Sequence, residues 1–138
     1  MIADSGFVVG LLNRRDRSHA RIAAVARSLT VRPWLPSPAI TEICYVLHRD
    51  VGAAGVATFL ARLADGSAGL AVLDPDPEDY RRASETMETY ADTGLDFVDA
   101  IIVAVAERLN VVTLLTLDHR HFAVIRPRHT AAFVLLPA

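Results

Sequence analysis

Four carboxylates lie where the sequence is otherwise apolar. One follows a short apolar segment at the N-terminus, one lies in an apolar helical stretch, one interrupts the most apolar run, and one follows a run of branched residues. In this order they are Asp4, Glu42, Asp99 and Asp118. A buried carboxylate costs several kcal/mol unless a partner compensates for its charge, and no neighbouring position supplies cations for all four. These residues are therefore the candidates for chemistry.

A cluster of such carboxylates would favour a divalent cation. Two carboxylates about 4 Å apart repel each other by about 4 kcal/mol at an effective dielectric of about 20, and a bound cation removes this repulsion. Oxygen ligands favour Mg²⁺ or Mn²⁺ over zinc, and the single cysteine, Cys44, is too little for a cysteine-based zinc site. The structural alternatives are that Asp118 caps a turn and that Glu42 pairs with Arg49.

The elements that must position these acids alternate between strands and helices. Apolar runs predict strands over residues 1–3, 31–35, 70–73, 111–117 and 132–136. Helical periodicity and capping residues predict helices over 7–13, 18–29, 38–47, 56–64, 77–90 and 97–109, with Ser37 as the N-cap of the third and glycines at 52 and 55 before the fourth. This alternation predicts an α/β fold with a mostly parallel sheet and helices on both faces.

The four acids fall at one edge of that sheet. Asp4 and Asp118 each follow a predicted strand, and Asp99 lies in the first turn of the most apolar helix. Glu42 lies one turn into its own helix. Because ligands bind outside the carboxyl ends of parallel strands, we expect these four side chains to form one cluster.

Further polar residues flank the acids. Asp96 suits the N-cap of the helix that holds Asp99, which gives Asp99 a competing capping role. Asp96 is also a candidate metal ligand, and so is Asp92. Three residues after the last acid are candidates for contact with phosphate, with a solvated turn as the alternative: His119, Arg120 and His121.

The composition is that of one domain. The chain has 138 residues, of which 52% are hydrophobic, so a single domain over residues 1–138 is expected. Its formal net charge of -2 does not indicate nucleic-acid binding over the whole surface. No apolar run reaches the ~18 residues of a membrane span, and the N-terminus lacks the basic start of a signal peptide. A cytoplasmic location is expected.

Other residues with chemical potential have simpler expected roles. Arg14, Arg15 and Arg17 form a charged turn that is expected on the solvated surface. Trp34 and Tyr45 could stack on bases, but we expect both in the core. These residues therefore stay outside the predicted site.

The four acidic segments together resemble the PIN-domain nucleases, in particular the VapC toxins of bacterial toxin–antitoxin pairs. The motifs that carry the resemblance are Ile2-Ala3-Asp4-Ser5, Thr41-Glu42, Phe97-Val98-Asp99-Ala100-Ile101, and Thr116-Leu117-Asp118 followed by Phe122. Each motif alone is weak, whereas four in order over nearly the whole chain are specific. One departure is Gly6, where the family more often has a small polar residue.

The resemblance implies a PIN-like three-layer fold and an endoribonuclease that depends on Mg²⁺ or Mn²⁺. Asp4, Glu42, Asp99 and Asp118 would hold one or two ions, and Ser5 and Thr116 would hydrogen-bond the carboxylates. The implied substrate is tRNA, rRNA or mRNA, cleaved in single-stranded loops or structured regions. The implied partners are a VapB-like antitoxin and a second copy of the chain.

Two other functional classes remain for comparison. One is a non-catalytic RNA- or protein-binding α/β module with a vestigial acidic metal site. The other is phosphoryl transfer on an aspartate, which would require a lysine near the pocket, and all 14 basic residues of this chain are arginines. Nucleotide-binding folds are excluded, because neither GxxxxGK[ST] nor a GxGxxG after the first strand is present.

Overall fold

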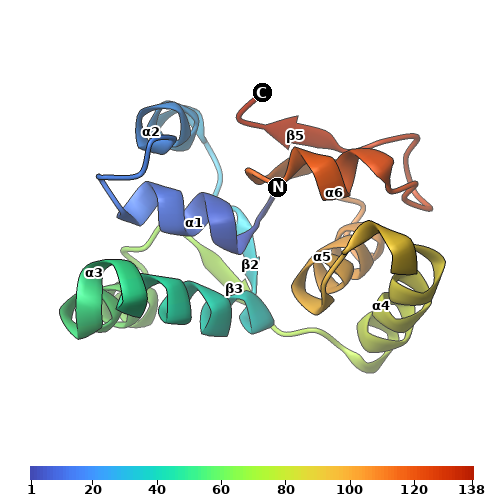
Figure 1. Ribbon diagram of the computed structural model, residues 1–138, viewed down its shortest axis with the longest axis horizontal. Coiled ribbons are helices and arrows are strands. Elements are labelled where there is room, and N and C mark those ends of the chain that lie inside the picture. Colours follow the sequence, from blue (N-terminus) through green and yellow to red (C-terminus); the bar gives the residue numbers. More distant parts are fainter.

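The chain folds around a five-stranded parallel sheet with helices on both faces (Figure 1). The computed structural model describes residues 1–138. The strands are β1 (Ile2–Ala3), β2 (Trp34–Pro36), β3 (Ala71–Leu73), β4 (Thr113–Leu115) and β5 (Val134–Leu136). Their order in the sheet is β3-β2-β1-β4-β5, and every pairing is parallel. The predicted α/β class and parallel sheet are confirmed.

The helices form two groups on either side of the sheet. They are α1 (Ser5–Leu12), α2 (His19–Ser28), α3 (Ser37–Asp65), α4 (Pro77–Thr89), α5 (Phe97–Arg108) and α6 (His119–Val124), with a 3-10 turn at Ala91–Thr93. In Figure 1, α1, α2 and α3 lie on the left, whereas α4, α5 and α6 lie on the right. No helix combines the length and the apolar character that a membrane crossing requires.

The sheet divides the hydrophobic core into two parts. Successive residues of a strand point to opposite faces, so Ile2 and Leu114 pack with α5, whereas Ala3 and Leu115 pack with α1 and α3. Helix α5 is buried from Asp99 to Ala106, as its apolar sequence predicts. This burial fixes the N-terminus of α5 beside the ends of β1 and β4.

Helix α3 differs from the prediction of two helices separated by Gly52 and Gly55. It is one element with a kink at Gly52, whose φ is 82° and ψ is 178°. Glycine adopts positive φ without steric penalty, so the chain bends at this residue and resumes the helix. Ser37 is the first helical residue rather than the N-cap, because Pro36 ends β2 and takes the capping position itself.

The strands are shorter than the apolar runs that predict them. Strand β2 begins at Trp34, which lies opposite Ile2 of β1 and Ala71 of β3. Residues 31–33 precede this register, and the Pro33 carbonyl accepts a hydrogen bond from the N–H of Ala71, the first residue of β3, at 3.0 Å. Strand β4 likewise covers only the residues that pair with β5, Thr113 to Leu115. Tyr45 is 71% exposed and Trp34 is 37% exposed, so the expectation of core packing for these two side chains is wrong.

Helix α6 contains His119, Arg120 and His121, for which the sequence predicts either contact with phosphate or a solvated turn. Its only fully buried side chain is Phe122, so the sequence carries no helical periodicity there. The helix begins because the Asp118 side chain accepts a hydrogen bond from the backbone N–H of His121 at 3.0 Å, which is N-capping.

Candidate active site

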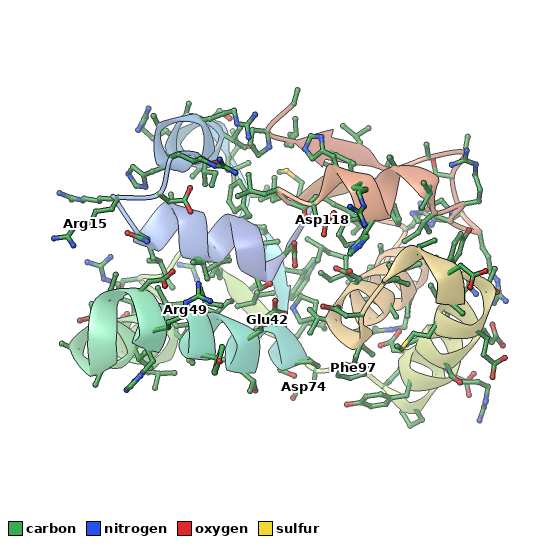
Figure 2. The ribbon with its side chains drawn as sticks, in the orientation of Figure 1. Arg15, Glu42, Arg49, Asp74, Phe97 and Asp118 are labelled. Carbon is green, nitrogen blue, oxygen red and sulfur yellow. The ribbon has the colours of Figure 1, made fainter.

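The structure brings Asp4, Glu42, Asp99 and Asp118 to one pocket of about 460 Å³ at the carboxyl edge of the sheet. Strands β1 and β4 are neighbours, so Asp4 and Asp118, which follow these strands, lie at adjacent strand ends. Figure 2 shows Glu42, on α3, and Asp118, ahead of α6, near the middle of the molecule. The four acids therefore lie together, as the sequence predicts.

Asp4 is held by both residues that were expected to support it. Its Oδ1 accepts the backbone N–H of Ser5 at 2.7 Å and the Ser5 hydroxyl at 3.3 Å. Its Oδ2 accepts the Thr116 hydroxyl at 2.8 Å. The Thr116 oxygen in turn accepts the backbone N–H of Asp118 at 2.9 Å. Thr116, which is fully buried, thus links the positions of two of the acids.

Asp96 and Asp99 form a capping box at the start of α5. The Asp96 side chain accepts the backbone N–H of Asp99 at 3.0 Å, and the Asp99 side chain accepts the backbone N–H of Asp96 at 3.4 Å. The predicted capping is therefore confirmed, and both capping residues also line the acidic pocket. Capping fixes the rotamer of Asp99, which is only 6% exposed.

The His121 ring lies close to the carboxylates of two of the acids. Its Nδ1 lies 3.0 Å from Asp99 Oδ2 and 2.9 Å from Asp118 Oδ2. The sequence placed this histidine among candidates for phosphate contact and did not predict its contact with the carboxylates. The sequence signal that could have indicated this contact is the spacing of three residues between Asp118 and His121, because residues three apart in a helix share a face.

Glu42 reaches the pocket from the first half of α3. The proposed pairing with Arg49 is absent, because the Arg49 Nε lies 2.7 Å from Asp50 instead. Burial raises the pKa of Glu42, and the negative charges of Asp96 and Asp4 raise this pKa further, whereas the Ser5 hydroxyl opposes the shift.

The pocket holds negative charge that no arginine neutralises. Burial raises the pKa of Asp99 to about 7, and the charges of Asp96 and Asp4 act in the same direction. Burial likewise raises the pKa of Asp4, against the opposing hydrogen bonds from Thr116 and Ser5. None of the ion pairs in the structure joins an arginine to any of the four acids. A carboxylate with a pKa raised by burial and neighbouring charge is typical of functional sites.

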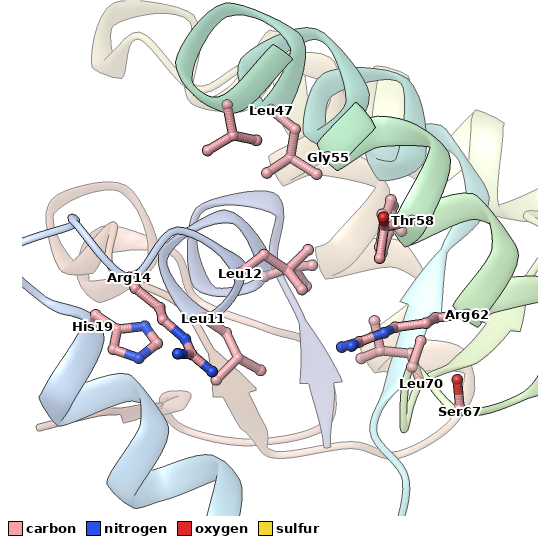
Figure 3. A pocket seen from close by; sticks show the side chains of 14 residues that line it. Leu11, Leu12, Arg14, His19, Leu47, Gly55, Thr58, Arg62, Ser67 and Leu70 are labelled. Atoms are coloured by element: carbon pink, nitrogen blue, oxygen red, sulfur yellow. The ribbon is translucent and has the colours of Figure 1, made fainter. Parts of the chain in front are cut away.

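The other candidates divide between the rim and distant surfaces. His119 and Arg120 line the pocket beside the acids. Asp92 is exposed and does not line it. Arg14, which is exposed as expected, lines a separate cavity of about 540 Å³ between α1 and α3, together with Arg62 (Figure 3).

The residues of the pocket fit a divalent metal ion. One ligand atom from each of Asp99, Asp118 and His121 lies within 4.8 Å of the others. Carboxylate oxygens are the ligands that hard divalent cations take in proteins. A cation would also compensate for the buried charge that raises the pKa of Asp99.

A family model and a curated relative each match most of the chain. The family model described as PIN domain matches residues 1–126. The curated protein Ribonuclease VapC26 of Mycobacterium tuberculosis is 28% identical over 141 aligned residues, which cover 99% of this chain and 100% of that protein.

Two solved structures share the fold. Mycobacterium tuberculosis VapC20, described as a sarcin-ricin loop cleaving toxin, superposes with a TM-score of 0.78 and 18% identity over 86% of this chain and 89% of that chain. FitAcB from Neisseria gonorrhoeae superposes with a TM-score of 0.64 and 17% identity over 97% of this chain and 94% of that chain.

Proposed function

Because the chain belongs to the PIN-domain family, we propose that it is a metal-dependent endoribonuclease and the toxin of a VapBC-type toxin–antitoxin pair. The resemblance to VapC-type PIN ribonucleases that the four motifs indicate is confirmed. The observation that carries the proposed chemistry is the pocket itself, where Asp4, Glu42, Asp99 and Asp118 meet without an arginine partner.

We propose that these four carboxylates hold one or two Mg²⁺ or Mn²⁺ ions, with Asp96 as a further candidate at the edge. When bound, the ions supply positive charge that stabilises the negative charge developing on the phosphodiester, and they acidify water. Ser5 and Thr116 keep Asp4 in a single orientation through the hydrogen bonds described above. Outer partners of this kind orient metal ligands and tune their basicity.

Glu42, His119 and Arg120 supply the protein groups that act on water and RNA in the proposed hydrolysis. Glu42 is half-buried and forms no ion pair, so its carboxylate is available to accept a proton from the attacking water. Attack by water on phosphorus, rather than by the neighbouring ribose hydroxyl, breaks the P–O3′ bond. The departing 3′ oxygen takes up a proton from solvent, so the products carry a 5′-phosphate and a 3′-hydroxyl. His119 and Arg120, at the rim of the pocket, would contact the phosphates on either side of the scissile bond.

The substrate class that fits is RNA with unpaired or loop nucleotides. The pocket lies at the open edge of the sheet, and unstacked bases are more accessible to proteins than bases in an A-form helix. VapC20, which shares the fold, is described as cleaving the sarcin-ricin loop. Loops of tRNA, rRNA and mRNA all belong to this substrate class.

The proposed partners follow from the acidic pocket and from the relatives. A VapB-like antitoxin with an arginine at its contact surface would neutralise the carboxylates, because arginine pairs with carboxylates through two hydrogen bonds. A homodimer and a cytoplasmic location complete the proposal.

The deciding experiment is cleavage of a structured RNA with Mg²⁺, with Mn²⁺ and with EDTA. Cleavage should require the metal and should be lost in Asp99→Asn, whereas the matched variant Asp79→Asn, at the start of α4, should keep it. Equal cleavage with EDTA, or by Asp99→Asn, contradicts the proposal. RNA binding without cleavage under every metal condition would favour the non-catalytic binding module instead.

The toxin assignment has its own test. Expression of the wild-type chain should arrest growth, and co-expression of the small protein encoded by the adjacent gene should restore it. Asp99→Asn should cause no arrest. Growth arrest by Asp99→Asn would separate toxicity from the acidic pocket and would contradict the assignment.

A further inference from the structure

We propose that His121 is itself a ligand of the divalent ion in the acidic pocket, through Nδ1, and that this nitrogen makes the site prefer Mn²⁺ to Mg²⁺. The inference rests on the proposed function, because it concerns the same ion. It adds a neutral nitrogen donor to what would otherwise be a ligand set made only of oxygens.

The first support is the number of acceptors around one nitrogen. Nδ1 of His121 lies within 3.0 Å of Asp99 Oδ2 and within 2.9 Å of Asp118 Oδ2. A ring nitrogen carries at most one hydrogen, so one N–H cannot be directed well at both oxygens. Two carboxylates from different elements therefore converge on this atom more closely than a single hydrogen bond explains.

The second support is that these distances suit a shared metal ion. In an octahedral shell with bonds of about 2.1 Å, ligand atoms at neighbouring positions are about 3.0 Å apart. The two N···O distances of 2.9 and 3.0 Å match such neighbouring positions. An ion can therefore replace the proton between these atoms with little movement of the three side chains.

The third support is that the imidazole is held in place by the backbone. Asp118 Oδ1 accepts the backbone N–H of His121 at 3.0 Å, and the next residue, Phe122, is anchored in the core at 1% exposure. The ring is 19% exposed, so its orientation does not depend on a mobile surface rotamer. Such pre-organisation favours metal binding over a passing contact.

The other ring nitrogen can carry the single hydrogen of a neutral imidazole. Nε2 of His121 faces the loop at Gly94, where a Cβ would lie 3.7 Å away. With its hydrogen on Nε2, a neutral histidine leaves the Nδ1 lone pair free for the ion, and the two nitrogens take these distinct roles in metal sites.

A nitrogen donor changes which ion the site favours. Mg²⁺ prefers oxygen ligands and keeps much of its water, whereas imidazole suits the transition metals. Replacing an oxygen position with Nδ1 should therefore strengthen Mn²⁺ binding relative to Mg²⁺ binding. His119 provides the control, because it lies on the same helix and lines the same pocket but makes no hydrogen bond or ion pair with the carboxylates.

The test uses the full chain loaded with Mn²⁺ and pulsed electron paramagnetic resonance, which detects nitrogen bound directly to the ion. Nitrogen modulation should be present in the wild type and in His119→Gln and absent in His121→Gln. The wild-type spectrum alone can overturn the inference, so it does not depend on how well the variant folds. Absent modulation in the wild type, no binding of Mn²⁺, or modulation that persists in His121→Gln would each refute it.

Calorimetric titration with Mn²⁺ and Mg²⁺ provides a second measurement. His121→Gln should weaken Mn²⁺ binding by at least about tenfold and Mg²⁺ binding by a smaller factor, because glutamine can still offer an oxygen. Equal losses for both ions contradict the preference. Mn²⁺ bound without nitrogen in a chain that cleaves RNA would refute this inference alone, and nitrogen-bound Mn²⁺ in a chain that never cleaves RNA would refute the proposed function alone.

Discussion

Helices α4 and α5 begin with the same local structure in opposite charge surroundings. Asp76 and Asp79 form a capping box at α4, as Asp96 and Asp99 do at α5. At α4, the Arg108 guanidinium lies 2.7 Å from Asp79 Oδ2 and 3.2 Å from Asp76 Oδ2. At α5 no arginine contacts the pair, and burial, together with the charges of Asp96 and Asp4, raises the pKa of Asp99 to about 7.

The difference shows that a structural role is enough to explain the acids at the start of α4, whereas it explains those at the start of α5 only in part. Arg108 ends the helix that Asp99 begins, so α5 places its cation beside α4 and leaves its own first turn acidic. Asp79 is 2% exposed and fully compensated. Asp99 is equally placed in its helix, but its partner is His121 rather than an arginine, and the charges of Asp96 and Asp4 lie beside it, as expected of a cation site.

The largest expected difference between the two boxes is in catalysis. Asp99→Asn keeps a side-chain oxygen that can cap the helix but loses the charge, so RNA cleavage should fall by at least about a hundredfold. Asp79→Asn makes the same chemical change outside the pocket and should leave the rate unchanged. Initial rates of cleavage of one RNA substrate, measured well below the melting temperatures of both variants, check this prediction. Equal losses of rate in the two variants would show that the charge of Asp99 has no special role in activity.

For stability the order should be the opposite, with Asp79→Asn more damaging than Asp99→Asn. Asp79→Asn removes the more buried of the two carboxylates that pair with Arg108 and leaves only the more exposed Asp76, so the free energy of unfolding should fall by about 2 kcal/mol. Urea denaturation at neutral pH measures this value. The double variant Asp79→Asn with Arg108→Met should recover part of the loss, and a single variant as stable as the wild type would show that the pair is not buried enough to matter.

The pH dependence of stability should identify Asp99 in the metal-free chain. Its pKa is about 7 in the folded state, against about 4 for an aspartate in an unfolded chain. Between these values the folded chain binds a proton that the unfolded chain has released, so stability falls as pH rises from about 4 to about 7. In EDTA, the wild type should lose about 2 kcal/mol more than Asp99→Asn between pH 5 and pH 8, after allowance for partial solvent screening.

Urea denaturation at both pH values, with each variant in EDTA, makes this comparison. The matched variant Asp79→Asn should show no such relative gain at high pH. A wild-type chain whose stability rises from pH 5 to pH 8 by as much as that of Asp99→Asn would mean that the pocket does not hold uncompensated charge.

The sequence predicts the acids of the pocket well because their signal is local. Asp4 and Asp118 follow apolar strands, and adjacent parallel strands end at one edge. The apolar run around Asp99 likewise predicts a buried helix, which α5 is. Each of these predictions needs only a few consecutive residues and the general architecture of a parallel sheet.

The features that the sequence did not reveal depend on distant residues. The ion pair that compensates Asp79 could not be predicted, because its arginine, Arg108, lies 29 residues away in the sequence. The contact of His121 with Asp99 spans 22 residues and requires α6, a helix with one fully buried side chain. The continuous α3 depends on a single backbone conformation at Gly52, which composition does not specify.

The smallest expected difference between the two boxes concerns the caps themselves. Replacing an aspartate N-cap with alanine typically lowers stability by about 1 kcal/mol, and Asp76→Ala should lose at least this amount because it also gives up its contact with Arg108. Asp96→Ala loses the same capping bond but removes a charge that raises the pKa of both Glu42 and Asp99. In EDTA at pH 8 the loss of the cap and the loss of charge repulsion oppose each other, so the net change in the free energy of unfolding of Asp96→Ala should be within about 0.5 kcal/mol of zero.

Thermal denaturation at low and high salt separates the capping effect from the charge effect. Salt screens the repulsion and should therefore expose the full capping loss in Asp96→Ala. Equal losses for the two alanine variants at low salt would show that the first turn of α5 carries no more electrostatic strain than that of α4.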